Sequence, residues 1–229
     1  MIQHRKTAPG KSQRRTFAER SEGRLRVEES KPAQPPRKTS DRGHAPDFPQ
    51  AVEHLIERVK PLVKPERFAH ILRVAELARQ IAGANGLDGE RAYLAGILHD
   101  AARDLPPERL FELAPPEIPL EREHPKSLHG RAGRRLAEGW GVSDPEVLEA
   151  IEGHVYGVDP TYPIAMAVYV ADVSEPGRGV NAEIRERALA GDLLGAYREA
   201  VETKLRYLQS KGIPPHPRTF SAYKKLVQG

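Results

Sequence analysis

Four histidines and two aspartates share one property: each falls on the apolar side of a stretch with helical periodicity. They are His70, His99, Asp100, His129, His154 and Asp172. His70, for example, is followed by Val74, Leu77 and Ile81, which together form one stripe of a helix. Neutral imidazole nitrogens and carboxylate oxygens are ligands for Mn, Fe, Co or Zn. The spacing therefore predicts a buried metal site built from several helices.

The cost of burying these groups is the reason for inferring a cation. An unpaired polar group costs about 2 kcal/mol or more when it is buried, and a lone carboxylate costs much more. One cation would satisfy the imidazoles and offset the charge of the aspartates. A single histidine on an apolar face is more often a satisfied core residue, but here the pattern repeats over five helices. The adjacent pair His99-Asp100 fits as well, because neighbouring helical residues meet at one ion most easily where a helix ends.

The elements that would position these residues are helices. From Gln50 onward the apolar residues recur with a period of about 3.6 rather than 2, interrupted by Pro, Gly and capping residues. We expect helices at 50–63, 65–84, 88–99, 126–138, 145–154, 163–173, 181–190 and 192–210, a short helix after Asp104, a proline-rich loop at 115–125 and a last turn or two within 218–227. The prediction is an all-α bundle of eight or nine helices.

Composition excludes several classes of protein. The 229 residues include no cysteine, which rules out thiol nucleophiles, disulfides, zinc fingers and iron–sulfur clusters. No apolar run approaches the roughly 18 residues of a membrane span, and the N-terminus lacks the apolar segment of a secretory signal. We therefore expect a cytoplasmic protein with no membrane partner.

The positive charge is concentrated near the N-terminus. The chain has a formal net charge of +4, and residues 1–50 hold 12 Lys+Arg against 6 Asp+Glu. Because these charges are mixed with proline, we predict a disordered basic tail at 1–47 and a folded domain at 48–229. The tail is interpreted mainly as a solvated extension or as the product of an upstream start codon. The alternative is a weak nucleic-acid or ribosome tether.

The ordered set of residues resembles the HD-domain metal-dependent phosphohydrolase superfamily, and in more detail its YqeK branch. The matching segments are Arg67-Phe-Ala-His70, Ala95-Gly-Ile-Leu-His-Asp100, Leu128-His-Gly130, Ala150-Ile-Glu-Gly-His154 and Tyr169-Val-Ala-Asp-Val-Ser-Glu-Pro-Gly-Arg178. The resemblance covers residues 50–229 and leaves the tail unmatched. It implies an HD-domain helical bundle that cleaves diadenosine tetraphosphate symmetrically into two ADP and uses iron or a similar divalent or ferric ion, with Mn, Co and Zn left open.

The resemblance also assigns roles to residues. It implies a first metal site of His70, His99, Asp100 and Asp172. His129 and His154 either complete a second site with Asp100 as the bridge or contact phosphate themselves. The residues implied near the nucleotide are Arg67, Arg103, His129, His154, Val155, Arg178, Thr219 and Tyr223. Arg103 stands where the family usually has Lys, and Val155 where it usually has Thr, which leaves the nucleotide preference open.

The implied mechanism is attack of a metal-bound water on the polyphosphate. We expect Asp100 to orient this water, and His129 or His154 to neutralise charge or protonate the leaving group. Arg103 and Arg178 would hold phosphate oxygens, although a surface ion pair explains each of them nearly as well.

Two alternatives remain at this stage. One is another HD-type phosphohydrolase, acting on guanosine tetraphosphate, a nucleoside monophosphate or a cyclic dinucleotide. The other is a non-catalytic nucleotide sensor or ribosome-associated factor with a structural metal. The assembly state is left open between a monomer and a homodimer.

Overall fold

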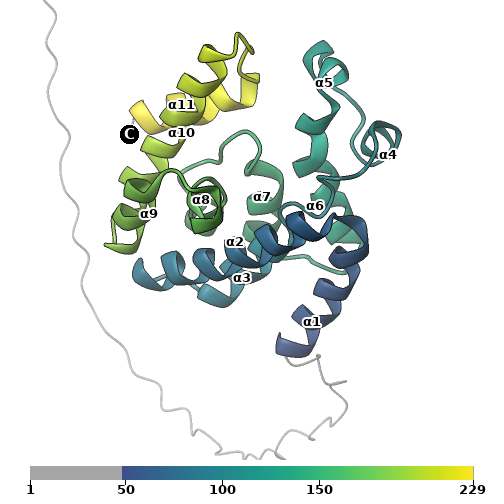
Figure 1. The fold of residues 1–229 in the computed structure, drawn as a ribbon, viewed down its shortest axis with the longest axis horizontal. Coiled ribbons are helices and arrows are strands. Elements are labelled where there is room, and N and C mark those ends of the chain that lie inside the picture. Colours follow the sequence, from purple (N-terminus) through teal and green to yellow (C-terminus); the bar gives the residue numbers. More distant parts are fainter. Residues whose placement is uncertain (1–47, 229) are drawn as a thin grey trace, which may run out of the picture. The chain divides into compact units, whose positions relative to one another are not determined.

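The computed structural model describes residues 48–228, and within this range every regular element is a helix. The α-helices are α1 (Phe48–Val59), α2 (Pro65–Ala84), α3 (Gly89–Leu98), α4 (Pro107–Leu113), α5 (Pro119–Glu123), α6 (His129–Gly139), α7 (Pro145–Gly153), α8 (Pro163–Ser174), α9 (Ala182–Leu189), α10 (Leu193–Ser210) and α11 (Pro217–Gln228). Figure 1 shows their arrangement. The predicted all-α class is confirmed.

The described residues hold eleven α-helices, where eight or nine were expected. The clearest difference is α5, which lies inside the range predicted to be a proline-rich loop. Pro119 stands in its first turn, and the Glu121 carboxylate accepts a hydrogen bond from the Glu117 amide at 2.6 Å. A helix of five residues is little more than one turn, so it carries no readable apolar period.

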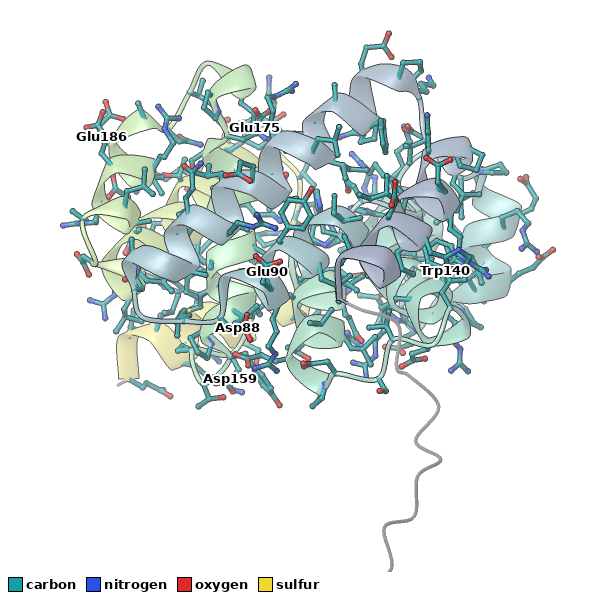
Figure 2. The ribbon with its side chains drawn as sticks, turned by 90° about the horizontal axis from the view of Figure 1, so that it is seen from below. Asp88, Glu90, Trp140, Asp159, Glu175 and Glu186 are labelled. Atoms are coloured by element: carbon teal, nitrogen blue, oxygen red, sulfur yellow. The ribbon has the colours of Figure 1, made fainter. Side chains whose placement is uncertain are left out.

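Capping residues fix where two of the site helices begin. The Asp88 carboxylate accepts hydrogen bonds from the Glu90 and Arg91 amides at the start of α3, and Figure 2 labels Asp88 and Glu90 there. Asp144 does the same at the start of α7. These caps set the register of α3 and α7, whose last turns lead directly into the polar residues of the site.

The core is centred on α8, which is buried along most of its length. Its residues Ile164–Ala171 are all buried and pack with α2, α3, α7 and α10 into one hydrophobic cluster. Two glycines allow close contacts between helices. A Cβ at Gly96 in α3 would lie 2.5 Å from the Ala75 Cα of α2, and a Cβ at Gly130 in α6 would collide with the Glu152 carbonyl of α7. Larger residues would separate helices that carry site residues.

Two expectations concern regions beyond this core. In the described residues 48–228 no helix is long and apolar enough to cross a membrane. The predicted basic tail at 1–47 lies outside the described residues.

Candidate active site

The structure brings all six inward-facing polar residues into one cluster. They come from five places in the fold: His70 from α2, His99 and Asp100 from the end of α3, His129 from the start of α6, His154 from the end of α7, and Asp172 from α8. In three overlapping groups of three residues, the potential ligand atoms lie within 4.8 Å of one another. Segments separated by about a hundred residues therefore contribute to a single site.

Asp100 stands at the centre of this cluster, and its two oxygens face different partners. Oδ1 lies 3.2 Å from His129 Nε2 and 3.4 Å from His154 Nε2. Oδ2 lies 3.8 Å from His99 Nε2 and 3.9 Å from His70 Nε2. One carboxylate thus joins two pairs of imidazoles.

Asp172 completes the group on the Oδ2 side. Its Oδ1 lies 3.1 Å from His70 Nε2 and 3.8 Å from His99 Nε2. Two arginines contact the carboxylates of the cluster: Arg67 donates to Asp100 Oδ2 at 3.0 Å, and Arg178 donates to Asp172 Oδ1. Each of the two carboxylates therefore has an arginine partner in addition to its histidine neighbours.

Three of the four imidazoles are oriented by their own chain. His99 Nδ1 lies 2.7 Å from the Gly96 carbonyl, His154 Nδ1 lies 2.7 Å from the Ile151 carbonyl, and His129 Nδ1 contacts the Lys126 carbonyl. Each carbonyl belongs to the residue three positions earlier. A carbonyl oxygen only accepts, so each Nδ1 carries a proton and each Nε2 faces the cluster.

His70 is oriented differently, because it lies in the middle of α2. Its Nδ1 contacts Glu175 Oε1 at 3.0 Å. Glu175 is buried and also accepts hydrogen bonds from Arg73 Nε at 2.6 Å and from the Gly177 amide at 2.7 Å. Burial opposes ionisation, but the Arg73 and His70 hydrogen bonds lower the pKa of Glu175 to about 2. Glu175 is therefore an anion that faces the outer nitrogen of a cluster histidine.

The cluster contains a polar atom with no partner. His99 is fully buried, and its Nε2 has no hydrogen-bond partner among the described residues. Burial lowers the pKa of His99 to about 4, against the opposing attraction of Asp100 and Asp172. The imidazole is therefore neutral at pH 7, and its lone pair points into the cluster without a donor.

A second observation in the cluster also calls for a positive charge. The Nε2 atoms of His129 and His154 lie only 2.9 Å apart. Lone pairs at this distance repel each other unless a proton or a cation lies between them. Four imidazole nitrogens and two carboxylates form a donor set that suits a divalent first-row metal.

Both carboxylates are ionised and able to act as ligands. Burial alone would raise the pKa of Asp100, but its contacts with the His99, His129 and His154 imidazoles hold it well below its usual range. The pKa of Asp172 is lowered in the same way, with burial opposed first by the contact with His70. The cluster therefore has the charge that a metal ion requires.

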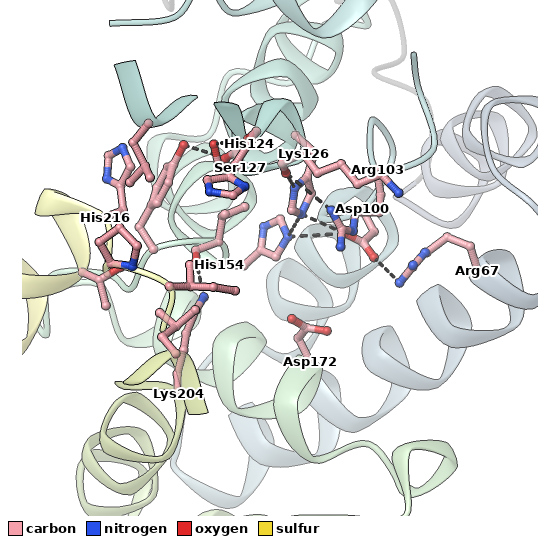
Figure 3. Close-up of a pocket in the computed structure, with 18 of the residues that line it drawn as sticks. Arg67, Asp100, Arg103, His124, Lys126, Ser127, His154, Asp172, Lys204 and His216 are labelled. Carbon is pink, nitrogen blue, oxygen red and sulfur yellow. Dashed lines mark hydrogen bonds and ion pairs between the residues drawn. The ribbon is translucent and has the colours of Figure 1, made fainter. Parts of the chain in front are cut away.

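The cluster opens into a cavity of about 470 Å³. Figure 3 shows this cavity with Asp100, His154 and Asp172 at one part of its wall. Of the residues predicted near a nucleotide, those that line it are Arg67, Arg103, His129, His154, Val155, Arg178 and Thr219. Tyr223 does not line it: α11 turns this side chain against the main hydrophobic core instead.

Several cavity residues were not found from the sequence. His216 lies with its ring 4.2 Å from the Tyr156 ring, and Lys204 reaches the cavity from α10. His124 and Lys126 also line the cavity. His216 and His124 adjoin prolines, and Lys204 lies on an amphipathic helix, so none carries an apolar-face signal. Glu175, which was given no role from the sequence, stands three residues after Asp172 and lies within the matching segment that ends at Arg178.

Comparisons with known proteins agree with this geometry. Residues 67–177 match the HD domain family. A Bacillus subtilis protein named "Bis(5'-nucleosyl)-tetraphosphatase, symmetrical" is 31% identical over 182 residues, covering 77% of this chain and 98% of that protein. A Mycoplasma genitalium protein named "Probable nicotinate-nucleotide adenylyltransferase/Ap4A hydrolase" is 39% identical over 128 residues, which are 55% of this chain but only 36% of that longer protein.

A solved structure is also similar. The crystal structure of a predicted HD superfamily hydrolase involved in NAD metabolism from Clostridium acetobutylicum aligns with a TM-score of 0.72 and 30% identity, covering 77% of this chain and 96% of the other. The family match at residues 67–177 spans all six residues of the cluster. The chain therefore belongs to the HD-domain hydrolases, in the branch that includes the symmetrical bis(5'-nucleosyl)-tetraphosphatases.

Proposed function

We propose that this hydrolase cleaves diadenosine tetraphosphate symmetrically into two molecules of ADP. The observation that carries the proposal is the imidazole–carboxylate cluster in the wall of a cavity that is also lined by five Lys and Arg side chains. A polyphosphate needs cations along its length, and its hydrolysis needs a group that activates water. The names of the relatives that align over most of their length support the same substrate.

The residues that would hold metal fall into two sets. His70, His99, Asp100 and Asp172 would form the first, and Asp100, His129 and His154 the second. The opposite orientation of the two Asp100 oxygens supports the bridging role. We propose iron, with Mn, Co and Zn as alternatives, since the donor set suits each of them. When bound, the metal would supply Lewis acidity toward water and phosphoryl oxygen.

The arginines and lysines of the cavity would bind the phosphates. Arg67 and Arg178 each donate one hydrogen bond to a cluster carboxylate, and Arg178 Nε also donates to the Asp172 main-chain carbonyl. Further N–H donors on each guanidinium remain for phosphate oxygens. Arg103 lines the cavity and makes a single 3.4 Å contact with the Lys126 carbonyl. These donors would offset the charge that moves onto the leaving phosphate.

Asp100, His129 and His154 would act closest to the reacting phosphorus. Asp100 is ionised and can accept a hydrogen bond from the attacking water. The Nδ1 atoms of His129 and His154 are committed to main-chain carbonyls, so each histidine can act only through Nε2. Each Nε2 therefore either binds a cation or contacts phosphate, but it cannot do both at once.

Product analysis tests the proposal. The metal-loaded protein is incubated with diadenosine tetraphosphate in ¹⁸O-labelled water, and the product nucleotides are separated and their masses measured by mass spectrometry. We expect ADP as the sole product, with one label for each pair of ADP molecules. ATP plus AMP, or hydrolysis only of guanosine tetraphosphate, a nucleoside monophosphate or a cyclic dinucleotide, would contradict it. The variant His54→Ala, at an exposed position in α1, serves as the control and should keep full turnover.

The domain division is tested by deleting residues 1–47. We propose that turnover is carried by 48–229 alone, because the cluster and cavity residues that the structure describes include all six predicted metal ligands. The deletion should leave kcat and KM unchanged. If the tail is a tether to nucleic acid or the ribosome, the full chain should bind RNA or ribosomes in a salt-dependent way. The same deletion should abolish this binding and still leave turnover intact.

A further inference from the structure

A short turn after α8 contacts two of the proposed metal ligands from outside the cluster. It is the 3₁₀ turn Pro176–Arg178, with Glu175 directly before it. Glu175 Oε1 lies 3.0 Å from His70 Nδ1, and Arg178 donates to Asp172 Oδ1. The position of this turn against α2 therefore affects how both ligands face the cluster.

The side chain of Arg73, on α2, joins this turn to the helix. Its Nε donates to Glu175 Oε2 at 2.6 Å and its Nη2 to Glu175 Oε1 at 3.2 Å, so the guanidinium contacts both carboxylate oxygens. Figure 2 labels Glu175 beside α2. A forked contact of this kind fixes the plane of a carboxylate, which a single hydrogen bond leaves free to rotate. Because Oε1 also faces His70, Arg73 sets the direction in which Glu175 meets the imidazole.

The main chain of the turn leaves space for this guanidinium. A Cβ at Gly177 would lie 2.6 Å from both Arg73 Nε and Arg73 Nη2. The Gly177 amide also donates to Glu175 Oε2 at 2.7 Å. One residue of the turn thus gives room to the arginine and a hydrogen bond to the carboxylate that the arginine holds.

The burial of Glu175 makes its cation necessary. Glu175 is only 1% exposed, whereas the Arg73 side chain is 43% exposed. A buried carboxylate that loses its counterion is driven toward water. For Glu175 that movement would break the contact with His70. The pair with Arg73 is neutral as a whole, so it orients the imidazole without adding net charge beside the metal ligands.

Arg73 differs in its position from the two arginines that contact the aspartates. Arg67 and Arg178 pair with Asp100 and Asp172 and also line the cavity. Arg73 and Glu175 are not among the residues of the cavity wall. A change at Arg73 can therefore alter the metal ligands without removing a proposed phosphate donor.

We infer that Arg73 is a positioning residue for the first metal site. It holds Glu175 and the turn after α8 against α2, and through them it holds His70 and Asp172 toward the cluster. The inference rests on the proposed function for the assignment of His70 and Asp172 as metal ligands. It gives a half-exposed arginine outside the cavity a role in metal affinity rather than in substrate binding.

Metal affinity of the full chain tests the inference. Mn²⁺ is titrated in competition with a chelator into the wild type, Arg73→Met, Gly177→Ala and the control Arg79→Met. Arg73→Met should weaken Mn²⁺ binding by about tenfold or more. Gly177→Ala keeps every charge and displaces only the guanidinium, so its effect should be in the same direction and smaller. Arg79→Met removes a different ion pair of the same helix, with Glu90, and should leave the affinity unchanged.

A rescue and a kinetic signature separate positioning from a general loss of structure. Glu175→Gln in the Arg73→Met background removes the unbalanced charge and keeps an acceptor for His70, so the double variant should bind Mn²⁺ more tightly than Arg73→Met alone. In steady-state assays, Arg73→Met should lower kcat at limiting metal with KM for diadenosine tetraphosphate nearly unchanged, and saturating metal should restore kcat. Melting temperatures measured without metal check that both arginine variants are folded.

The outcomes distinguish this inference from the proposed function. Wild-type or tighter Mn²⁺ affinity in Arg73→Met would overturn the inference even if the chain hydrolyses the dinucleotide. A loss of affinity that Glu175→Gln does not reduce would also overturn it, because the effect would then not pass through the carboxylate. Metal binding that depends on Arg73, in a protein that does not hydrolyse diadenosine tetraphosphate, would instead refute the proposed substrate and keep the positioning role.

Discussion

The two sides of the cluster are built in different ways. His129 and His154 lie on α6 and α7, which follow each other in the chain, and both imidazoles are oriented by carbonyls of their own turns. The opposite side takes His70, His99 and Asp172 from α2, α3 and α8. There His70 depends on Glu175, which is 105 residues away.

The difference shows what each side requires from the fold. The α6–α7 side needs only two neighbouring helices to pack together. The other side needs α8 and the turn after it to return to α2, so it depends on contacts between distant parts of the chain. Substitutions should therefore be able to impair one side while the other survives, unless they change the residue that both sides share.

Asp100→Ala should have the largest effect, because it removes the one residue common to both sides. We expect turnover to fall by about a thousandfold or more, and metal content measured by elemental analysis to fall to near zero, with helix content by circular dichroism nearly unchanged. Glu186→Ala, on the exposed face of α9, is the control and should match the wild type. Wild-type turnover in Asp100→Ala would remove this residue from the mechanism.

Gly130→Ala should impair the α6–α7 side. The added methyl group would collide with the Glu152 carbonyl, so α6 must move away from α7 and His129 away from His154. We expect the free energy of unfolding in urea to fall by about 1 to 3 kcal/mol and the metal content, measured by elemental analysis, to fall. Gly139→Ala in the same helix has open space around the new methyl group and should cause neither change. Equal behaviour of the two variants would show that the close contact is not needed.

Glu175→Ala should impair only the opposite side. Without the carboxylate the His70 ring is free to rotate and to change its tautomer, so we expect affinity for the first metal ion to weaken by about 10- to 100-fold in competition with a chelator. Glu175→Gln keeps an acceptor for His70 Nδ1–H and should recover most of the affinity. If Glu175→Ala bound metal as tightly as the wild type, the long-range contact would have no part in orienting His70.

The last prediction is a pH dependence that belongs to His99, and it applies to metal-free protein only. In metal-free protein its pKa is about 4, below the ordinary value of 6.5, because it is fully buried. Between these values the unfolded chain binds more protons, so the free energy of unfolding should fall as the pH drops from 6.5 to 4, by at most about 1.4 kcal/mol per pH unit. Urea unfolding at several pH values measures this slope. His99→Leu should reduce it, whereas His54→Ala should not.

Much of the fold could be predicted from residue patterns. The helix expected at 65–84 has these same bounds in the structure, and the helices expected at 88–99 and 145–154 correspond to α3 and α7. The inward direction of the six polar residues followed from their spacing relative to apolar neighbours. Local patterns were sufficient here because helix period and capping are properties of adjacent residues.

Features that depend on the packing between helices could not be predicted in this way. Glu175 matters because a turn returns it to α2, and no local pattern encodes a contact over 105 residues. Lys204 and His216 line the cavity only through the placement of α10 and of the chain that follows it. Because α11 packs against α10, the Tyr223 side chain lies against the core rather than in the cavity. The metal-binding and substrate roles of the other residues stay predictions.

The division of Asp100 between two groups of imidazoles has a thermodynamic consequence. If both proposed metal sites are filled, a cation on one side would withdraw electron density from a carboxylate that also serves the other, and it would hold that carboxylate in place. The two binding events would then share a coupling free energy, and by linkage the effect of each on the other would be equal. A metal titration of this protein should follow a cooperative or anticooperative isotherm rather than two independent ones.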